Sequence, residues 1–346
     1  MNYGIIGSGS WGTAIAKILT DNGQHIYWWN RSESAIEQFK IKKHNPQYLP
    51  SARFDMNKLS LTTNAEEVIQ KSDTIIIAVP SAYIVEVLSA LPKNIFQGKK
   101  ILSAIKGILP EENLLLNDYL SMHFAVTIEN YFAVLGPCHA EEVAAEKLSY
   151  LTFSGVDQTA TTEIAEGFKT TYLRTIINKD IYGVQYAAVL KNIYAVGAGI
   201  AYGLDYGDNF LSVLIANSAD EMAGFLRKAG IINAEVGYIE HGSKSMVGQA
   251  HHNYAASVYL GDLLVTCYSL FSRNRTFGTM IGKGYAVKSA QLEMSMVAEG
   301  YNASKCMSII NQKINADMPI AETIFKILWQ NLSAAEGFKN IEEHLV

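Results

Sequence analysis

One lysine stands in an otherwise uncharged stretch, AAVLKNIYAVGAGIAYG, at residues 187–203. The apolar spacing predicts a buried helix, with the small residues Ala187 and Ala195 one turn before and after Lys191. Burial disfavours a charged amine, so we expect the pKa of Lys191 to be lowered and its proton to be transferable. That property suits a general acid or base. The alternative is a lysine near a helix end whose ammonium reaches water.

Two further stretches place donors where ligands of α/β proteins bind. Lys106, in SAIKG, follows a predicted strand, at the end where open parallel sheets bind ligands. The stretch GPCHAEE, residues 136–142, joins another strand to a helix start. Its N–H groups between Cys138 and Ala140 can receive an anion or a carbonyl oxygen.

Arg273 and Asn274, in SRNRTFG, offer a planar fork of donors and an amide suited to a phosphate. Taken singly, Lys106 and Arg273 would more often be solvated surface charges. Two ammonium groups, including that of Lys191, and a guanidinium in one cleft would instead select a small dianionic ligand such as a phosphate ester. A net charge of −5 makes such a local excess of positive charge more informative.

A glycine-rich turn lies near the start of the chain, between a predicted strand at 2–7 and a predicted helix at 10–22. Gly7, Gly9 and Gly12 fit G-x-G-x-x-G, in which the glycines allow a tight turn, close approach of a pyrophosphate and close packing of helix on strand. The helix N-terminus adds N–H groups and its positive dipole end. The turn therefore predicts a dinucleotide site.

The end of the second predicted strand bears on the choice of cofactor. An acidic residue there would bind the ribose of NAD, but this chain has Asn30 and Arg31. A guanidinium suits the 2′-phosphate of NADP, so we expect NADP or both cofactors, with NADP favoured. A solvated loop arginine is the alternative.

These residues need elements to position them. Up to about residue 180, apolar strands alternate with amphipathic helices, and DTIIIAVP is an unbroken strand signal typical of a doubly wound parallel sheet. From 181 onward apolar residues recur at helical spacing. The sequence predicts a Rossmann-like α/β domain at 1–180 that binds a dinucleotide, and an all-α domain at 181–346 that binds substrate and holds the catalytic lysine.

Composition limits the classes of protein. A charged fraction of 18% and 28 basic against 33 acidic residues argue against general affinity for nucleic acid. The lysine and glycines of 181–203 argue against membrane insertion, and we expect no signal peptide. Three widely spaced cysteines indicate a reducing compartment, the cytoplasm. A homodimer is expected from the commonness of twofold assemblies.

Several motifs together resemble one family. GSGSWGTA, AVPS, SAIKGI, GPCHAEEV, VLKNIYAVGAGI, GDLLVTCYSLFSRNRTFG and VAEGY occur in the order and approximate spacing of bacterial-type NAD(P)-dependent glycerol-3-phosphate dehydrogenases, over about residues 4–335. The resemblance implies reversible reduction of dihydroxyacetone phosphate to sn-glycerol 3-phosphate, supplying phospholipid synthesis.

The resemblance also implies roles for individual residues. Lys191 would donate and accept the proton, Lys106 would polarise the carbonyl, and Asp262 would hold the ammonium. Thr266 and Asn192 would orient these groups. The substrate contacts would be Lys106, Gly136, Cys138, Lys191, Asp262, Ser272, Arg273 and Asn274. The cofactor contacts would be Gly7, Gly9, Ser10, Trp11, Gly12, Arg31, Lys106, Ala140, Arg273, Val297 and Glu299.

The chain departs from the family pattern in two places. Cys138 stands where a serine or threonine is usual, and a thiol is a poorer donor, which puts its substrate contact in doubt. Residues 241–256 are longer than in the common form. Their adjacent His251 and His252 point apart and lack a suitably spaced partner, so we expect no metal site.

Two other functions remain open at this level. A related two-domain dehydrogenase could act on another hydroxy acid, since fold alone does not select a substrate. A non-catalytic nicotinamide sensor could use the same cleft. A need for Arg273 and Asn274 in substrate binding would distinguish a phosphate substrate from another hydroxy acid. A need for Lys191 in turnover would distinguish an enzyme from a sensor.

Overall fold

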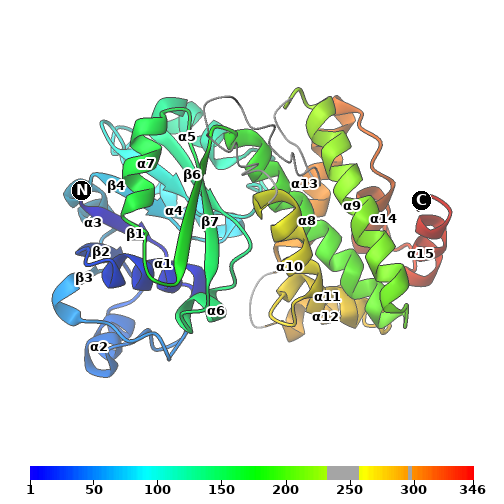
Figure 1. Cartoon of the computed structure of the whole chain (residues 1–346), viewed down its shortest axis with the longest axis horizontal. Helices are drawn as coiled ribbons and strands as arrows, with labels where there is room; N and C mark the ends of the chain where they lie inside the picture. Colours follow the sequence, from blue (N-terminus) through cyan, green and yellow to red (C-terminus); the bar gives the residue numbers. More distant parts are fainter. Residues whose placement is uncertain (232–256, 295–297) are drawn as a thin grey trace, which may run out of the picture. The chain divides into compact units, whose positions relative to one another are not determined.

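The computed structural model describes residues 1–231, 257–294 and 298–346 (Figure 1). The chain divides into two compact units, Met1–Ile181 and Tyr182–Val346. No helix in the described residues has the length and apolar character to cross a membrane. The predicted histidine pair His251–His252 lies outside the described residues.

The first unit is built on one eight-stranded sheet with the order β3-β2-β1-β4-β5-β6-β7-β8. The strands are β1 (Tyr3–Ile6), β2 (Ile26–Trp29), β3 (Leu59–Thr62), β4 (Thr74–Ile77), β5 (Lys100–Ser103), β6 (Tyr131–Leu135), β7 (Ser149–Ser154) and β8 (Leu173–Asn178). The helices are α1 (Ser10–Asp21), α2 (Glu33–Lys42), α3 (Ala65–Lys71), α4 (Ser81–Ser89), α5 (Leu116–Phe124), α6 (Ala140–Ala144) and α7 (Gln158–Glu166), with 3₁₀ turns at η1 (Met56–Lys58) and η2 (Ile128–Asn130).

Both faces of this sheet are covered (Figure 1). Ile76 of β4 packs in a core with α1, α2, α6 and α7, while its neighbours Ile75 and Ile77 pack in a second core with α3, α4 and α5. This alternation follows from the opposite directions of successive side chains in a strand. The unbroken apolar run of β4 thus reflects burial on both sides, and the doubly wound prediction is confirmed.

The prediction of a parallel sheet is wrong at one pairing. β6 and β7 are antiparallel, whereas β7 and β8 are again parallel. The chain passes from β6 to β7 through residues 136–148, which contain the five-residue α6. β1 and β4 lie side by side, so the chain winds away from them in both directions. In open α/β sheets, ligands bind at such a reversal.

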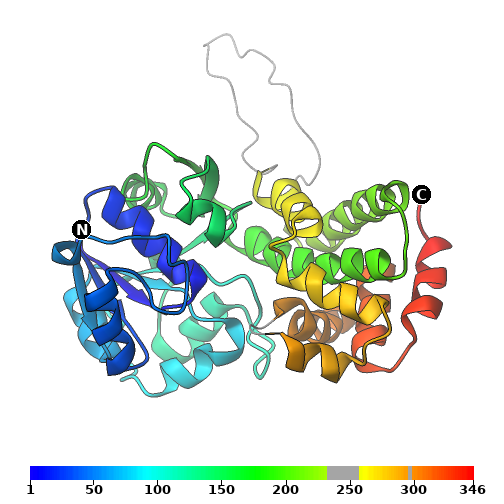
Figure 2. The same ribbon diagram turned by 90° about the horizontal axis from the view of Figure 1, so that it is seen from below.

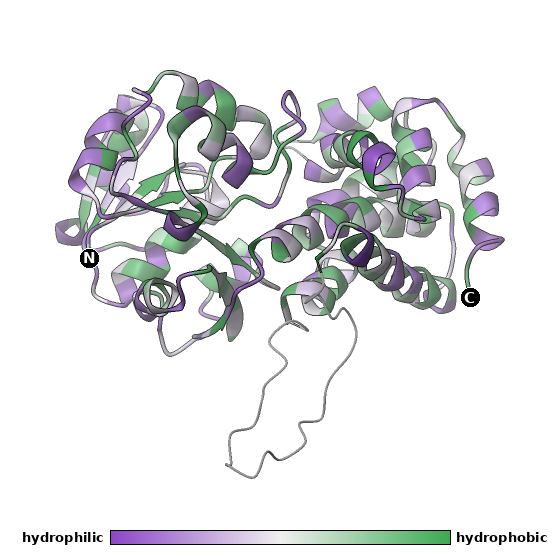
Figure 3. Ribbon diagram, turned by 90° about the horizontal axis from the view of Figure 1, so that it is seen from above, coloured by the Kyte–Doolittle hydropathy of each residue, from purple (hydrophilic) through white to green (hydrophobic). Residues whose placement is uncertain are grey.

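In the second unit the described residues form helices and no strands. They are α8 (Ile181–Gly203), α9 (Asp208–Lys228), a π-helical turn η3 (Ser257–Gly261), α10 (Asp262–Tyr268), α11 (Arg273–Gly282), α12 (Val287–Glu293), α13 (Glu299–Ile314), α14 (Pro319–Trp329) and α15 (Ala334–Glu342). Their ribbons alternate between hydrophilic and hydrophobic colours in Figure 3, as expected for amphipathic helices.

α8 is the central helix of this unit, flanked by others in Figure 2. Every residue from 191 to 200 is buried. Its glycines allow close contact: a Cβ at Gly197 would lie 2.7 Å from Ile324 of α14, and one at Gly199 would overlap the backbone of Arg275 in α11. The stretch at residues 187–203, whose one charged residue is Lys191, therefore lies in a core helix, as predicted from its apolar spacing.

Candidate functional site

The glycine-rich turn connects β1 to α1 at the reversal of strand order. Gly7 has φ +122°, and a Cβ there would lie 2.6 Å from the carbonyl oxygen of Ala78. A Cβ at Gly12 would overlap the carbonyl oxygen of Gly7, but one at Gly9 would meet no atom within 4 Å. The turn is thus closely packed at its first and third glycines and open at its second. This arrangement fits a pyrophosphate approaching the backbone at Gly9.

Three buried side chains hold successive carbonyl groups of this turn. The indole Nε1 of Trp28 donates to the oxygen of Gly7 at 2.9 Å. The amide Nδ2 of Asn45 donates to the oxygen of Ser8 at 2.9 Å. The hydroxyl of Thr13 donates to the oxygen of Gly9 at 2.8 Å. The backbone of the turn is therefore fixed from one side.

Ser10 and Trp11, two predicted cofactor contacts, lie at the start of α1, and the Trp11 ring is close to the ammonium of Lys106. Ser10 is the first residue of α1, and Trp11 is partly buried against the core. The ammonium of Lys106 lies 5.6 Å from the centroid of the Trp11 ring, within the range of a cation–π contact. It also donates to the carbonyl oxygen of Gly136 at 2.9 Å. The structure thus brings Trp11, Lys106 and Gly136 together.

The loop after β6 holds Cys138 and Ala140. A Cβ at Gly136 would lie 2.7 Å from the carbonyl oxygen of Tyr150, so this position requires glycine. The thiol of Cys138 is buried and donates to the same oxygen at 3.1 Å. Its hydrogen bond therefore supports the loop itself, and its contact with substrate stays a prediction. Ala140 is the buried first residue of α6.

Arg31, a predicted cofactor contact, follows β2 in the chain. Its side chain is exposed. Asn30 is buried and its amide donates to the carbonyl oxygen of Trp28 at 3.3 Å. No carboxylate stands directly after this strand, so nothing at Asn30 or Arg31 would repel a 2′-phosphate.

Lys191 forms the centre of the second group of predicted residues, which lies in Tyr182–Val346. Its side chain is 3% exposed, and its ammonium forms a salt bridge with the buried carboxylate of Asp262 at the start of α10. It also donates to the hydroxyl of Thr266 at 3.1 Å. Lys191 is thus not a lysine that reaches water from a helix end, because it is in the middle of α8 and buried.

Thr266 and Cys267 lie close to the ion pair of Lys191 and Asp262. Thr266 donates to the backbone oxygen of Asp262 at 2.5 Å, which fixes the direction in which its hydroxyl accepts from Lys191. Burial raises the pKa of the Cys267 thiol to about 12, although the nearby charges of Lys191 and Arg275 act in the opposite direction. An ion pair in a site of this kind depends on its own partners, because little water reaches it.

A chain of amides connects three helices beside the ion pair. Asn274 of α11 donates to the amide oxygen of Asn192 at 2.9 Å and accepts from the backbone N–H of Gly300 at 2.9 Å. A Cβ at Gly300 would overlap the backbone oxygen of Asn192, so α13 approaches α8 closely here. The residue that follows Lys191 is therefore held by α11 and α13.

The remaining predicted residues lie at the starts of α11 and α13. The hydroxyl of Ser272 caps α11 by accepting from the N–H of Arg275 at 3.3 Å. Arg273 is the first residue of that helix and is exposed. Glu299 is the first residue of α13 and is partly buried. Val297 lies outside the described residues.

The predicted residues fall into two groups, one in each unit. Met1–Ile181 holds the glycine-rich turn with Ser10, Trp11, Lys106, Gly136, Cys138 and Ala140, and it also holds the exposed Arg31 after β2. Tyr182–Val346 holds Lys191, Asn192, Asp262, Thr266 and Asn274, with Ser272, Arg273 and Glu299 at helix starts.

Sequence reasoning missed Trp28, Asn45 and Gly300. The first two hold the turn and the third holds Asn274. An Asn-Pro pair at 45–46 predicts a turn, but nothing local indicates which carbonyl the asparagine reaches.

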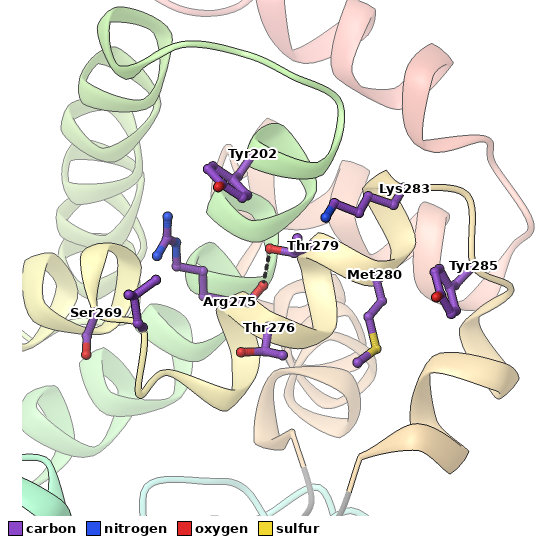
Figure 4. A pocket seen from close by; sticks show the side chains of 9 residues that line it. Tyr202, Ser269, Arg275, Thr276, Thr279, Met280, Lys283 and Tyr285 are labelled. Atoms are coloured by element: carbon purple, nitrogen blue, oxygen red, sulfur yellow. Dashed lines mark hydrogen bonds between the residues drawn. The ribbon is translucent and has the colours of Figure 1, made fainter.

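A hollow of about 290 Å³ lies elsewhere on the second unit (Figure 4). Its lining is Tyr202, Ser269, Leu270, Arg275, Thr276, Thr279, Met280, Lys283 and Tyr285, and it includes no residue predicted for the site. The guanidinium of Arg275 is engaged there, 5.0 Å from the Tyr202 ring and donating to the oxygen of Tyr268 at 3.1 Å. Lys191 and Asp262 do not line this hollow.

Comparisons with known proteins agree with the arrangement. The family profile "NAD-dependent glycerol-3-phosphate dehydrogenase N-terminus" matches residues 2–161, and its C-terminus counterpart matches residues 180–339. The glycerol-3-phosphate dehydrogenase (NAD(P)+) of Bacillus subtilis is 33% identical over 94% of this chain and 89% of its own length. A Staphylococcus aureus protein of the same name is 30% identical over 98% of this chain and 97% of its own length.

A solved structure shows the same fold. The crystal structure of glycerol-3-phosphate dehydrogenase from Coxiella burnetii superposes with a TM-score of 0.85 at 26% identity, covering 99% of this chain and 98% of that one.

Proposed function

Because the chain belongs to the NAD-dependent glycerol-3-phosphate dehydrogenase family, we propose that it reduces dihydroxyacetone phosphate reversibly to sn-glycerol 3-phosphate. NAD or NADP is the cofactor. The observation that most supports this mechanism is that the ammonium of Lys191 is buried and is bound by Asp262 and Thr266. The product would supply glycerol phosphate for phospholipid synthesis.

The first unit binds the cofactor. The open side of Gly9 and the N-terminus of the twelve-residue α1 fit a pyrophosphate, whose charge the helix dipole and the N–H groups of the turn would balance. Trp11 and Lys106 extend this surface towards Gly136. A cofactor held by these residues would supply or accept the hydride at C2 of the substrate. Ala140, Val297 and Glu299 are further proposed cofactor contacts.

Lys191 supplies and removes the proton. During reduction its Nζ–H is given to the substrate oxygen that becomes the C2 hydroxyl, and during oxidation the neutral amine takes that proton back. Asp262 and Thr266 hold Nζ in place, and the carboxylate stabilises the ammonium each time it forms. Asn192 is fixed by Asn274 and keeps the adjoining turn of α8 in register.

The phosphate of the substrate is bound by donors. Arg273, exposed at the N-terminus of α11, offers a fork of N–H groups where the helix dipole also favours an anion. Asn274 and Ser272 lie beside it in the sequence, and Lys106 is a further proposed contact of the substrate.

The proposal is tested by mixing the purified protein with dihydroxyacetone phosphate and NADPH or NADH and following the absorbance of the reduced nicotinamide. Oxidation of the nicotinamide with formation of sn-glycerol 3-phosphate is expected. Absence of turnover with both cofactors, while the protein still binds them, would indicate a nicotinamide sensor.

Arg273→Ala distinguishes a phosphate substrate from another hydroxy acid. Losing a bidentate contact with a doubly charged group should raise the KM for dihydroxyacetone phosphate about 10- to 100-fold. An unchanged KM would favour a related dehydrogenase with a different substrate.

We also propose that the protein is located in the cytoplasm and forms a homodimer. All three cysteines lie in the described residues as buried thiols, which supports a cytoplasmic location. A homodimer remains the commonest assembly for such chains. Light scattering on the purified protein tests the second point, and a monomer would contradict it.

A further inference from the structure

Asn45 stands outside every motif assigned above, yet it contacts the cofactor turn. It lies in the segment between α2 and η1 and is 3% exposed. Its Nδ2 donates both of its hydrogens, to the oxygen of Ser8 at 2.9 Å and to the hydroxyl of Thr13 at 2.8 Å. The amide nitrogen is therefore fully used by the turn and by the first helix.

The other end of the same amide holds its own segment. Oδ1 accepts from the N–H of Gln47 at 3.0 Å and from that of Tyr48 at 3.2 Å. These two bonds are the local pattern by which an asparagine stabilises the turn that follows it. Asn45 thus joins a rigid loop to the glycine-rich turn 37 residues earlier.

The contact with Ser8 fixes the direction of an N–H group. In a trans peptide the C=O and the N–H point to opposite sides, and the described chain has no cis peptide. With the oxygen of Ser8 held towards Asn45, the N–H of Gly9 points away from Asn45. Thr13 holds the oxygen of Gly9 in the same way, which directs the N–H of Ser10.

The side to which these groups point is where a ligand can approach. A Cβ at Gly9 would meet no atom within 4 Å, so the backbone there has room in front of it. A pyrophosphate needs N–H groups that are already oriented, because orienting them on binding would cost affinity. Donation from Asn45 to Thr13 also sets which way the threonine hydroxyl donates, since its own hydrogen then goes to Gly9.

We infer that Asn45 is a positioning residue for cofactor binding: it holds the Ser8 carbonyl and Thr13 so that the N–H groups of Gly9 and Ser10 face the pyrophosphate. The inference rests on the proposed function for the identity of the ligand. It assigns Asn45 no contact with substrate or nicotinamide.

The experiment compares two variants with a matched control. Asn45→Ala removes all four hydrogen bonds, whereas Asn45→Asp keeps the acceptor for Gln47 and Tyr48 and loses only the donors to the turn. The control is Asn64→Ala, which removes an asparagine that caps α3 in the same unit. All are titrated calorimetrically with NADPH, with NADH and with ADP-ribose, which carries the pyrophosphate but no nicotinamide.

Both Asn45 variants should raise the Kd of all three ligands about 10- to 100-fold, the effect of weakening one or two hydrogen bonds from the N–H groups of Gly9 and Ser10 to the charged pyrophosphate. At saturating cofactor their kcat and their KM for dihydroxyacetone phosphate should stay within about threefold of the wild type. Asn64→Ala should lower the melting temperature without changing any Kd.

The outcomes separate the inference from the proposed function. Wild-type protein that binds no dinucleotide overturns the proposed function. Wild-type protein that binds, with Asn45→Asp binding equally well, overturns the role of Asn45 alone. Should Asn45→Ala fail to fold, Asn45→Asp decides the question, because its isosteric side chain retains the local turn. A fall in kcat with unchanged Kd would also contradict the inference.

Discussion

In Met1–Ile181 the predicted site centres on the backbone of one turn, whereas in Tyr182–Val346 it centres on the buried ion pair of Lys191 and Asp262. The turn needs three glycines and three side chains that hold its carbonyls. The lysine needs a carboxylate and a hydroxyl from another helix. A backbone site recognises shape and a helix dipole and has no proton to give, while a buried ion pair can transfer a proton but depends on its partners.

The difference extends to other buried groups. In the second unit Glu221 of α9 is also buried, and its carboxylate accepts from the N–H groups of Ile320 and Ala321 at the start of α14 and from Tyr194 of α8. Tyr194 lies one turn after Lys191. We therefore expect the second unit to be the more sensitive to pH and to the loss of single charges.

The largest expected effect is that of Lys191→Met, which removes the proton donor and keeps its volume. Turnover should fall about 10²- to 10⁴-fold, the usual contribution of a general acid or base, while the Kd of NADPH stays within about twofold. Steady-state kinetics and calorimetry measure the two quantities. The control is Lys283→Met, an exposed lysine of the same unit.

This variant leaves the Asp262 carboxylate buried without its cation, so it should also be less stable than the wild type. Adding Asp262→Asn should recover part of the melting temperature but none of the turnover. If Lys191→Met kept more than about a tenth of wild-type turnover, a proton-transfer role for Lys191 would be excluded.

Glu221 gives the next largest effect, a dependence of stability on pH. Burial raises its pKa from 4.5 to about 7. Between these values the folded protein holds a proton that the unfolded chain has released, so the free energy of unfolding falls as the pH rises from about 4.5 to about 7 and is constant above. The shift corresponds to about 3 kcal/mol.

Glu221→Gln should remove this part of the pH dependence, as measured by hydrogen exchange in α9 and α14 at several pH values between about 4.5 and about 7. The helices of Met1–Ile181 serve as the internal control, since their protection should respond equally in both proteins. An unchanged slope in the variant would show that another group titrates.

Alanine substitutions distinguish the role of Gly9 in cofactor binding from the role of Gly12 in packing. Gly9→Ala points its Cβ into open space, so the protein should keep its melting temperature while the Kd of NADPH rises about tenfold or more. Gly12→Ala must displace the carbonyl of Gly7, and it should lose both stability and cofactor binding. Unaltered binding by Gly9→Ala would mean that the pyrophosphate approaches elsewhere.

The smallest expected effect concerns the choice of cofactor. Arg31→Ala should raise the KM for NADPH about tenfold and leave that for NADH within about twofold, since only the former has a 2′-phosphate. Arg174, another exposed arginine of this unit, supplies the control Arg174→Ala. Equal changes in the KM for NADPH and the KM for NADH would indicate that Arg31 is a solvated loop residue without a role in the choice of cofactor.

Local patterns were sufficient for much of the fold. The run at β4, the glycines at 7, 9 and 12, and the helical spacing after 181 each depend on residues close together in the chain, and the structure confirms the sheet, the turn and the helices. The antiparallel pairing of β6 with β7 was not predicted, because strand spacing does not reveal the direction in which the next strand runs.

The candidate site divides in the same way. The sequence by itself determined that Lys191 lies on an apolar helix and that a phosphate-binding turn precedes α1, since backbone geometry and hydrophobic periodicity are local properties. The family resemblance, and not the spacing of residues, implied that Asp262, 71 residues away, holds the ammonium of Lys191, and the tertiary structure shows this salt bridge. Only the tertiary structure decided that Asn45 and Trp28 hold the turn. Hydrogen bonds between such distant residues follow from how helices and strands pack, and no spacing within one segment encodes them.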